Sequence, residues 1–324
     1  MEILIIVVQL VVGVLGLHFG ANWLVSGSSK LALTFGIKPL VIGLTVVAMG
    51  TSAPELTVSL AGAFQGNTDL AVGNVVGSNI ANIGLILGIS ATIRPMQIES
   101  EVFKRDLPFM LAATFLLVLA AYFGGPREGA DGGAAFMLGR VEGVILISGM
   151  AFFIWFMLRG SRSAGGTAPK SRKGTRRWMV ALTIIGLGVL LIGGKLFVDG
   201  AVSAAQMLGV PELVIGLTVV AVGTSLPELA TSIVAILKGE SAISVGNVVG
   251  SNIFNIFLVL GIVALIQPLP INVKVMQLDM IVMVAISVWV TGMAWRAKGL
   301  NRLHGVSLLA FYGIYVANLF FGWV

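Results

Sequence analysis

Long apolar runs separated by short polar breaks dominate this chain. A membrane-spanning helix needs about 20 mostly apolar residues, and by that measure the sequence predicts ten spans. They cover residues 3–34, 39–64, 70–92, 105–124, 134–158, 179–208, 212–237, 243–265, 277–296 and 304–323. Turn-forming residues fill the breaks, as in "QGNTD" at 65–69 and "QPLP" at 267–270. The pattern predicts an all-α integral membrane protein with ten transmembrane helices.

Composition agrees with lipid as the surrounding medium. Of the 324 residues, 57% are hydrophobic and 10% are charged, and the mean hydropathy is +1.02. A soluble domain has roughly 25% charged residues. The chain has no cysteine, which excludes disulfides and thiolate metal sites, and its two histidines, His18 and His304, are far apart. We therefore expect the lipid bilayer as a partner, and the sequence indicates no resident cofactor and no obligate protein partner.

Basic residues gather in one segment, which divides the chain. Seven of them occur there without an acidic residue among them: Arg159, Arg162, Lys170, Arg172, Lys173, Arg176 and Arg177. The positive-inside rule predicts that this segment, residues 159–178, is a cytoplasmic linker rather than a nucleic-acid surface. It separates five spans in residues 1–158 from five in residues 179–324. Counting outward from it predicts a multi-pass cell-membrane protein with both termini outside the cytoplasm.

A repeat with an offset of 173 residues is the strongest internal signal. "LVIGLTVVAMGTSAPEL" (40–56) matches "LVIGLTVVAVGTSLPEL" (213–229), and "VGNVVGSNIANI" (72–83) matches "VGNVVGSNIFNI" (245–256). Each half has an odd number of spans, so the halves enter the membrane with opposite polarity. Inverted repeats are typical of secondary transporters, whose ion sites lie at mid-membrane on interrupted helices of both halves. We expect broken helices in spans 2, 3, 7 and 8, within repeat regions of about 36–92 and 209–265.

Each repeat places one glutamate, Glu55 or Glu228, near the middle of a span. An ionisable side chain at that depth costs about 3 kcal/mol unless it meets a partner or water. The basic residues inside spans, Lys195 and Arg140, have acidic neighbours of their own in the sequence. A bound cation is therefore the favoured partner of the two carboxylates.

Oxygen-bearing residues surround both glutamates in the sequence. A proline before each glutamate removes a helical hydrogen bond and releases a carbonyl oxygen. The hydroxyl and amide oxygens come from Thr51, Ser52, Ser78 and Asn82, and from their repeat partners Thr224, Ser225, Ser251 and Asn255. Asn79 and Asn252 either bind the ion or hold neighbouring helices together. Oxygen ligands without thiolate or imidazole suit Ca²⁺, Na⁺ or Mg²⁺.

The segments "GTS-x-PE" and "GN-VVGSNI-x-NI" resemble the two alpha-repeats of the sodium/calcium exchanger family in its compact prokaryotic form. The resemblance implies antiport of Ca²⁺ against Na⁺ by alternating access, hence a transporter and not an enzyme. It also implies that the long spans 1 and 6 slide during transport. The implied Ca²⁺ ligands are Glu55, Glu228 and the carbonyls around Thr51 and Thr224. The implied Na⁺ ligands are the same glutamates with oxygens of Ala48, Ser52, Ala221, Ser225, Ser78 and Ser251, and Asn82 and Asn255 line the same centre.

Asn255 stands where some relatives, including potassium-dependent ones, carry Asp. With Asn at both symmetric positions, 82 and 255, the implied centre has two formal negative charges. Electrogenic Na⁺/Ca²⁺ exchange is the favoured reading, and coupling to H⁺ or a requirement for K⁺ is the alternative. The "GNA-x-E" pattern of proton-coupled relatives is absent, which favours Na⁺. A cation channel is less favoured because the chain supplies a single pair of glutamates rather than a ring of charges.

Overall fold

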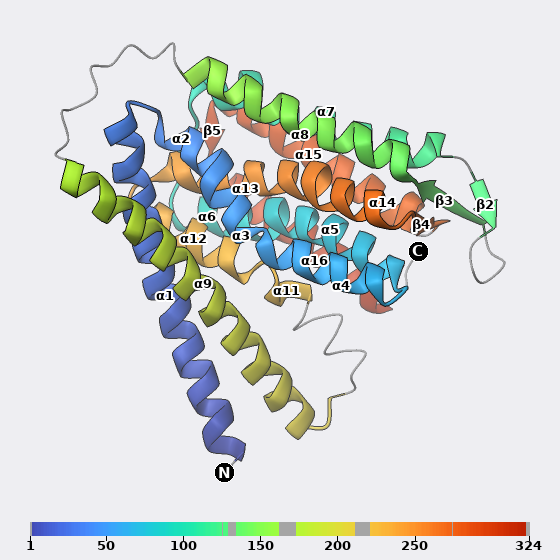
Figure 1. Ribbon diagram of the computed structural model, residues 1–324, viewed down its shortest axis with the longest axis horizontal. Coiled ribbons are helices and arrows are strands. Elements are labelled where there is room, and N and C mark those ends of the chain that lie inside the picture. The colour runs from blue at the N-terminus through green and yellow to red at the C-terminus, as the bar shows by residue number, and fades with distance from the viewer. Residues whose placement is uncertain are drawn as a thin grey trace. The chain divides into compact units, whose positions relative to one another are not determined.

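The computed structural model describes residues 2–124, 126–128, 134–161, 173–210, 221–273 and 275–321. The chain forms two compact units (Figure 1). Unit 1 consists of Met1–Pro54 and Ser161–Asn247, and unit 2 consists of Glu55–Gly160 and Val248–Val324. Each unit therefore combines segments from both halves of the sequence repeat.

Unit 1 is built around two very long helices. Its elements are α1 (Glu2–Phe35), α2 (Pro39–Ile42), the π-helical η1 (Gly43–Val47), α3 (Ala48–Thr51), the start of α4 (Ala53–Phe64), α9 (Lys173–Met207), α11 (Ala221–Gly223), α12 (Leu226–Leu237) and the first part of α13 (Ser241–Phe254). Helices α1 and α9 contain 34 and 35 residues and run side by side. Their length agrees with the unusual extent of predicted spans 1 and 6.

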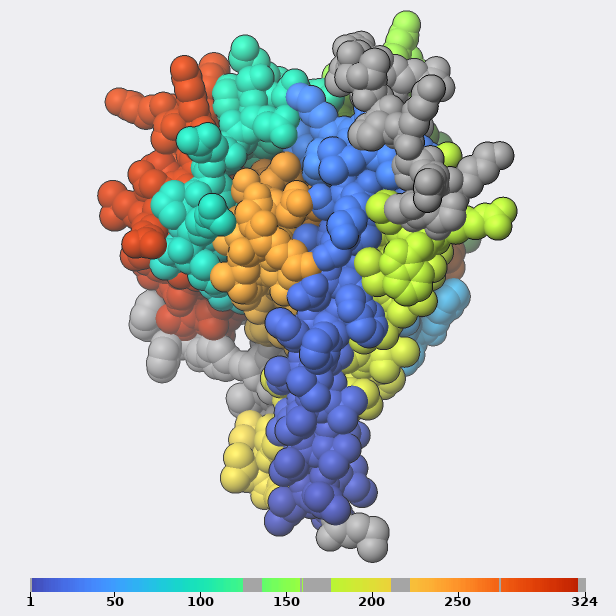
Figure 2. Space-filling model, turned by 90° about the vertical axis from the view of Figure 1, so that its left-hand side faces the viewer, coloured from blue at the N-terminus to red at the C-terminus, as the bar shows by residue number. Residues whose placement is uncertain are grey.

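Glycines bring the backbones of α1 and α9 into direct contact. A Cβ atom at Gly20 would lie 2.3 Å from the backbone nitrogen of Leu190, and one at Gly16 would lie 2.7 Å from the Cα of Gly193. Figure 2 shows α1 in blue with residues of α9, in yellow-green and yellow, against it. Small residues allow such close approach between membrane helices. The two helices therefore form one tightly packed pair.

We expect Gly20→Ala to destabilise unit 1, because its methyl group has to displace the α9 backbone. Overpacking of this kind costs about 1–3 kcal/mol. Gly188→Ala is the matched control, since a Cβ there meets no atom of a described residue within 4 Å. Thermal unfolding of the detergent-solubilised variants measures the effect, and equal midpoints for the two variants would contradict the packing described.

Unit 2 contains the other described helices and the described strands. Its helices are the rest of α4 and α13, α5 (Thr68–Ala81), η2 (Asn82–Leu87), α6 (Gly88–Ile93), η3 (Val102–Asp106), α7 (Leu107–Phe123), α8 (Arg140–Ser161), η5 (Asn255–Leu260), α14 (Gly261–Ile266), η6 (Val275–Asp279), α15 (Met280–Ala297) and α16 (Arg302–Phe321). Strand β1 (Met96–Gln97) pairs antiparallel with β5 (Gly299–Leu300). Strands β2 (Pro126–Glu128), β3 (Ala134–Leu138) and β4 (Leu269–Asn272) form an antiparallel sheet with β3 in the middle.

The predicted spans agree with the helices except at the starts of spans 5 and 6. Helix α9 begins at Lys173, so residues 173–178, predicted as part of the linker, are helical. Eight of the described helices are long and apolar enough to cross a membrane, and α16 adds 20 residues over predicted span 10. Predicted span 7 (212–237) is described only from residue 221, where it continues as α11 and α12. Residues 162–172 of the predicted linker also lie outside the described residues.

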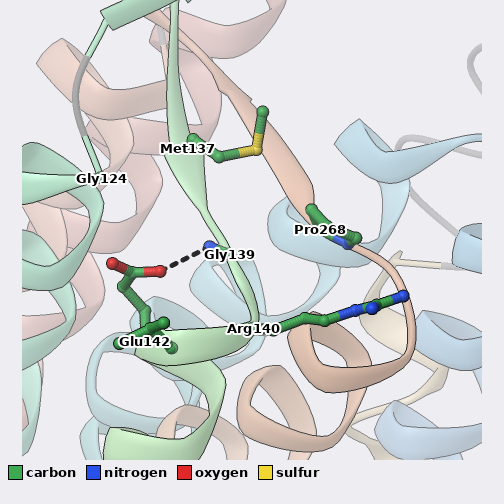
Figure 3. A pocket seen from close by; sticks show the side chains of 7 residues that line it. Gly124, Met137, Gly139, Arg140, Glu142 and Pro268 are labelled. Carbon is green, nitrogen blue, oxygen red and sulfur yellow. Dashed lines mark hydrogen bonds between the residues drawn. The ribbon is translucent and has the colours of Figure 1, made fainter.

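The predicted start of span 5 at residue 134 is wrong. Residues 134–138 form β3, whose backbone pairs with β2 and β4, and the helix begins at Arg140. The Glu142 carboxylate accepts a hydrogen bond from the Gly139 N–H at 2.9 Å, which caps the first turn of α8. Figure 3 shows this bond beside a cavity of about 390 Å³ that Met137 and Pro268 help to line. Sheet pairing therefore overrides the apolar pattern at this helix start.

The interruptions in the repeat helices take two forms. Spans 2 and 7 break at Ser52 and Ser225, just before α4 and α12. In spans 3 and 8 the helix continues, and the π-helical segments η2 and η5 occupy the same repeat positions. Single π-helical turns are common at functional sites. The breaks and these π-helical turns both lie in the repeated segments that the sequence predicts to form the ion site.

Candidate cation site

Each unit carries one of the two repeat glutamates. Glu55 in unit 2 and Glu228 in unit 1 are both 0% exposed. Each lies in the first turn of its helix, α4 or α12, where the helix dipole favours a negative charge. The sequence motif explains this position, because a proline is well tolerated in the first turn of a helix but not in its interior. The repeat therefore restarts a helix immediately before each carboxylate.

The serine before each restart has an unusual backbone conformation. Ser52 has φ −81° and ψ 6°, and Ser225 has φ −88° and ψ 3°. These values fall in the sparsely populated bridge region, which is found frequently in active sites. The two copies agree within a few degrees, so the "GTS-x-PE" motif folds in the same way in both repeats.

Residues of both repeats meet at Glu228 inside unit 1. The Ser52 hydroxyl donates a hydrogen bond to Glu228 Oε1 at 3.2 Å. The Thr51 hydroxyl donates to Asn247 Oδ1 at 3.0 Å, and Asn247 Nδ2 donates to the Glu228 backbone carbonyl at 3.3 Å. A hydroxyl-bearing turn of the first repeat thus contacts the carboxylate of the second.

An asparagine and a serine brace each glutamate in the same way. In unit 2, Asn74 Nδ2 donates to the Glu55 carbonyl at 3.2 Å and to Ser59 Oγ at 3.0 Å. In unit 1, Asn247 Nδ2 likewise donates to Ser232 Oγ at 3.2 Å. The sequence-based prediction missed these four bracing residues, although all of them are identical between the repeats at the 173-residue offset.

Four asparagines form a reciprocal network in unit 2. Asn82 Nδ2 donates to Asn252 Oδ1 at 3.0 Å, and Asn255 Nδ2 donates to Asn79 Oδ1 at 3.1 Å. Asn79 and Asn252 also donate to each other's backbone carbonyls, both at 3.4 Å. Among the described residues, Oδ1 of Asn82 and Oδ1 of Asn255 are buried and receive no hydrogen bond. The network therefore holds two amide oxygens in place as available acceptors.

The other predicted ligands are buried or backbone groups. Thr224, Ser225, Ser78 and Ser251 are between 0% and 8% exposed. The Ala48 carbonyl accepts the Ser52 N–H at 3.0 Å and the Thr51 hydroxyl at 3.3 Å. Ala221 begins α11, and its side chain lies outside the description.

The donor chemistry is that of a hard-cation site. Lys195, which could compete as a counter-ion in unit 1, pairs with Asp199 at 2.9 Å on an exposed part of α9. In the described part of the chain, no three His, Cys, Asp or Glu side chains come together as metal ligands. The oxygens around each carboxylate therefore come from neutral hydroxyls, amides and carbonyls, a set that suits Na⁺ and Ca²⁺.

Comparison with known proteins identifies the family. The family model described as sodium/calcium exchanger protein matches residues 5–159 and 178–321. The chain belongs to the sodium/calcium exchanger family. It is similar to the inner membrane protein YrbG of Escherichia coli, with 38% identity over 96% of this chain and 95% of the relative. It is also similar to the sodium/calcium exchanger MaX1 of Methanosarcina acetivorans, with 34% identity over 98% of this chain and 99% of the relative.

The fold matches that of a solved exchanger. The structure of the sodium-calcium exchanger NCX_Mj soaked with 10 mM Na⁺ and 10 mM Sr²⁺ has a TM-score of 0.84 to this chain. The two share 32% sequence identity over 98% of this chain and 99% of the other. The predicted all-α membrane fold with inverted repeats is therefore confirmed. The protein is an antiporter of the exchanger family, and its relatives move cations rather than catalyse a reaction.

Proposed function

We propose that this protein exchanges Ca²⁺ for Na⁺ across the cell membrane by alternating access. The observation that carries the proposal is a fully buried glutamate in each repeat, whose backbone carbonyl accepts a hydrogen bond from an asparagine amide. A buried carboxylate needs a compensating charge, and a transported cation supplies one. The relative MaX1 is named a sodium/calcium exchanger, and NCX_Mj has been soaked with Na⁺ and Ca²⁺, which supports these two ions as substrates.

In this proposal Glu55 and Glu228 are both ligands of one Ca²⁺, assisted by the backbone carbonyls around Thr51 and Thr224. Sodium ions use the same carboxylates with the Ala48 and Ala221 carbonyls and the hydroxyls of Ser52, Ser225, Ser78 and Ser251. The available Oδ1 atoms of Asn82 and Asn255 support this assignment. The Ser52 hydroxyl, assigned to Na⁺, contacts the carboxylate of Glu228, which is assigned to both ions. This contact supports the use of the same carboxylate by Na⁺ and Ca²⁺.

The proposed exchange is electrogenic when more than two Na⁺ are exchanged for one Ca²⁺. Two carboxylates balance one Ca²⁺, and Asn82 and Asn255 add no charge. If three Na⁺ replace the Ca²⁺, one net positive charge crosses the membrane in each cycle. The rate of exchange then depends on membrane potential.

Charge distribution supports an orientation with both termini outside the cytoplasm. Arg176 and Arg177 lie near the start of α9, and Arg296 and Lys298 lie at the end of α15. Both positions fall on the same predicted side of the membrane, and basic residues concentrate on the cytoplasmic side.

Reconstitution into liposomes tests the coupling ion. We expect an outward Na⁺ gradient to drive ⁴⁵Ca²⁺ uptake at clamped potential, and an inside-negative potential to change its rate. Potassium and proton gradients, each imposed alone, should drive none. Uptake that follows the H⁺ or K⁺ gradient instead would overturn the proposed coupling, and single-channel conductance would overturn antiport itself.

A further inference from the structure

Three buried hydroxyl groups of unit 1 stand out because they lack a hydrogen-bond partner among the described residues. Ser28, Thr231 and Ser244 are each 0% exposed, and their side-chain oxygens make no hydrogen bond to any described residue. Hydroxyls in membrane helices ordinarily bond back to the carbonyl four residues earlier. Thr45 and Thr183 of the same unit do so, at 2.6 Å and 2.9 Å. The three hydroxyls are therefore exceptions that require an explanation.

The three groups lie on α1, α12 and α13, which supply most of an apolar cluster that also includes Ile42, Val47 and Leu190. That cluster contains Leu24, Val25 and Ala32 of α1, Val234 and Ala235 of α12, and Ile243 of α13. Ser28 lies one turn after Leu24, Thr231 lies one turn before Val234 and Ala235, and Ser244 directly follows Ile243. Buried polar groups without partners destabilise such a core. Packing alone does not account for them.

Their positions lie between the carboxylate and one end of the unit. Thr231 follows Glu228 by three residues along α12, towards the turn at 238–240. Ser244 lies between that turn and the bracing residue Asn247 along α13. The same turn contacts α1, because the Ser29 hydroxyl donates to Glu240 Oε1 at 2.6 Å. The hydroxyls thus occupy the segments that lead from Glu228 to the turn.

No hydroxyl stands at the position that the repeat pairs with any of these three residues. Shifting by 173 residues pairs Ser28 with Ala201, Thr231 with Val58 and Ser244 with Ala71. The glutamates and their bracing residues, in contrast, are identical in both repeats. The three hydroxyls therefore break the symmetry between the two repeats.

The packing of α1 indicates where this cluster can open. On its α9 face the contact is backbone to backbone through Gly16 and Gly20. On its α12 face it combines side-chain packing with polar contacts at the turn, where Lys238 Nζ donates to Asn22 and Ser26. Lys238 is partly desolvated there, which lowers its pKa from the ordinary value. When α1 separates from α12, the polar groups on this face can exchange their contacts for hydrogen bonds to water. The α12 face is therefore the one that can open.

We infer that Ser28, Thr231 and Ser244 line a hydrated route for Na⁺ and Ca²⁺ between Glu228 and the turn at 238–240. In the structure the three hydroxyls are buried and make no hydrogen bond to a described residue. When α1 separates from α12 and α13, water and the passing cation supply those partners. The inference rests on the proposed cation exchange and deepens it, because it assigns one access route to the helices α1, α12 and α13.

Cysteine labelling tests the route directly, since the protein has no cysteine of its own. Single variants Ser28→Cys, Thr231→Cys and Ser244→Cys are exposed to a membrane-impermeant cationic thiol reagent with Na⁺, with Ca²⁺ or with neither. Lys238→Cys marks the accessible face, and Leu117→Cys in α7 is the control, because Leu117 is 0% exposed and lies outside the cluster. We expect all three to react at least tenfold faster than Leu117→Cys from the Lys238 face, in at least one ionic condition. Reaction no faster than that of Leu117→Cys in every condition would overturn the route.

Transport by variants that copy the first repeat supplies a second readout. Thr231→Val and Ser244→Ala should slow ⁴⁵Ca²⁺ flux severalfold with little change in Ca²⁺ affinity, whereas Thr231→Ser should keep the wild-type rate. Equal rates for Thr231→Val and Thr231→Ser would overturn the role of the hydroxyl. If the proposed exchange itself is wrong, the wild-type protein shows no Na⁺-driven flux. The labelling result is independent of this outcome, because it does not depend on the coupling ion.

Discussion

Glu228→Gln is expected to abolish Ca²⁺ transport, and Glu55→Gln is expected to do the same. The substitution keeps the size of the side chain and an oxygen that can accept the Ser52 hydrogen bond. It removes one of the two charges assigned to the ion. Losing one partner of a buried charge pair costs about 3–5 kcal/mol, which corresponds to a loss of affinity of roughly 100-fold or more.

The glutamate variants are assayed by ⁴⁵Ca²⁺ uptake into liposomes, with protein amount and folding checked for each variant. Glu2→Gln is the matched control, because Glu2 is exposed at the start of α1 and should keep full activity. The repeat symmetry makes the expectation stricter, since both glutamates should matter to a similar degree. Full activity in either variant would show that the ligand assignment is wrong.

Asn252→Ala should destabilise unit 2 and impair transport, and Asn79→Ala should match it closely. Removing the Asn252 side chain takes away the acceptor of the Asn82 amide and its own bond to the Asn79 carbonyl. Leaving a buried donor without a partner costs about 1–3 kcal/mol. The loss also releases Asn82 Oδ1 from its position, so Ca²⁺ affinity should fall as well.

Thermal unfolding and Ca²⁺ binding of the two asparagine variants measure these effects. Met110→Leu is the control, because it removes only the weak contact between Asn252 Nδ2 and the Met110 sulfur at 3.6 Å. It should leave both quantities close to wild type. Markedly unequal effects of Asn79→Ala and Asn252→Ala would contradict the reciprocal network.

Much of the candidate site was predictable because the chain contains two copies of it. A single "GTSAPEL" is compatible with a simple helix kink, whereas a second copy 173 residues later identifies Glu55 and Glu228 as equivalent. Proline before each glutamate predicts the break, and the structure has it at Ser52 and Ser225. The membrane spans were predictable because helices in lipid satisfy their own backbone hydrogen bonds.

Other features depend on contacts that a linear pattern does not contain. The residues of β3 are as apolar as the first turn of a membrane helix, so hydropathy does not distinguish the two. Pairing with β2 and β4 is what makes this segment a strand. The bracing role of Asn74 and Asn247 arises from neighbouring helices, so the repeat identity marks these residues without assigning them a partner. The π-helical turns at Asn82 and Asn255 likewise have no signature in hydropathy.

Equilibrium binding of ⁴⁵Ca²⁺ to the purified protein during titration with Na⁺ tests the central claim most directly. The account predicts one Ca²⁺ per chain, displaced by Na⁺ with a steeper than first-power dependence because several Na⁺ replace it. It also predicts no binding by the Glu55→Gln/Glu228→Gln double variant. Ca²⁺ that stays bound at saturating Na⁺, or that binds the double variant as tightly as wild type, would contradict it.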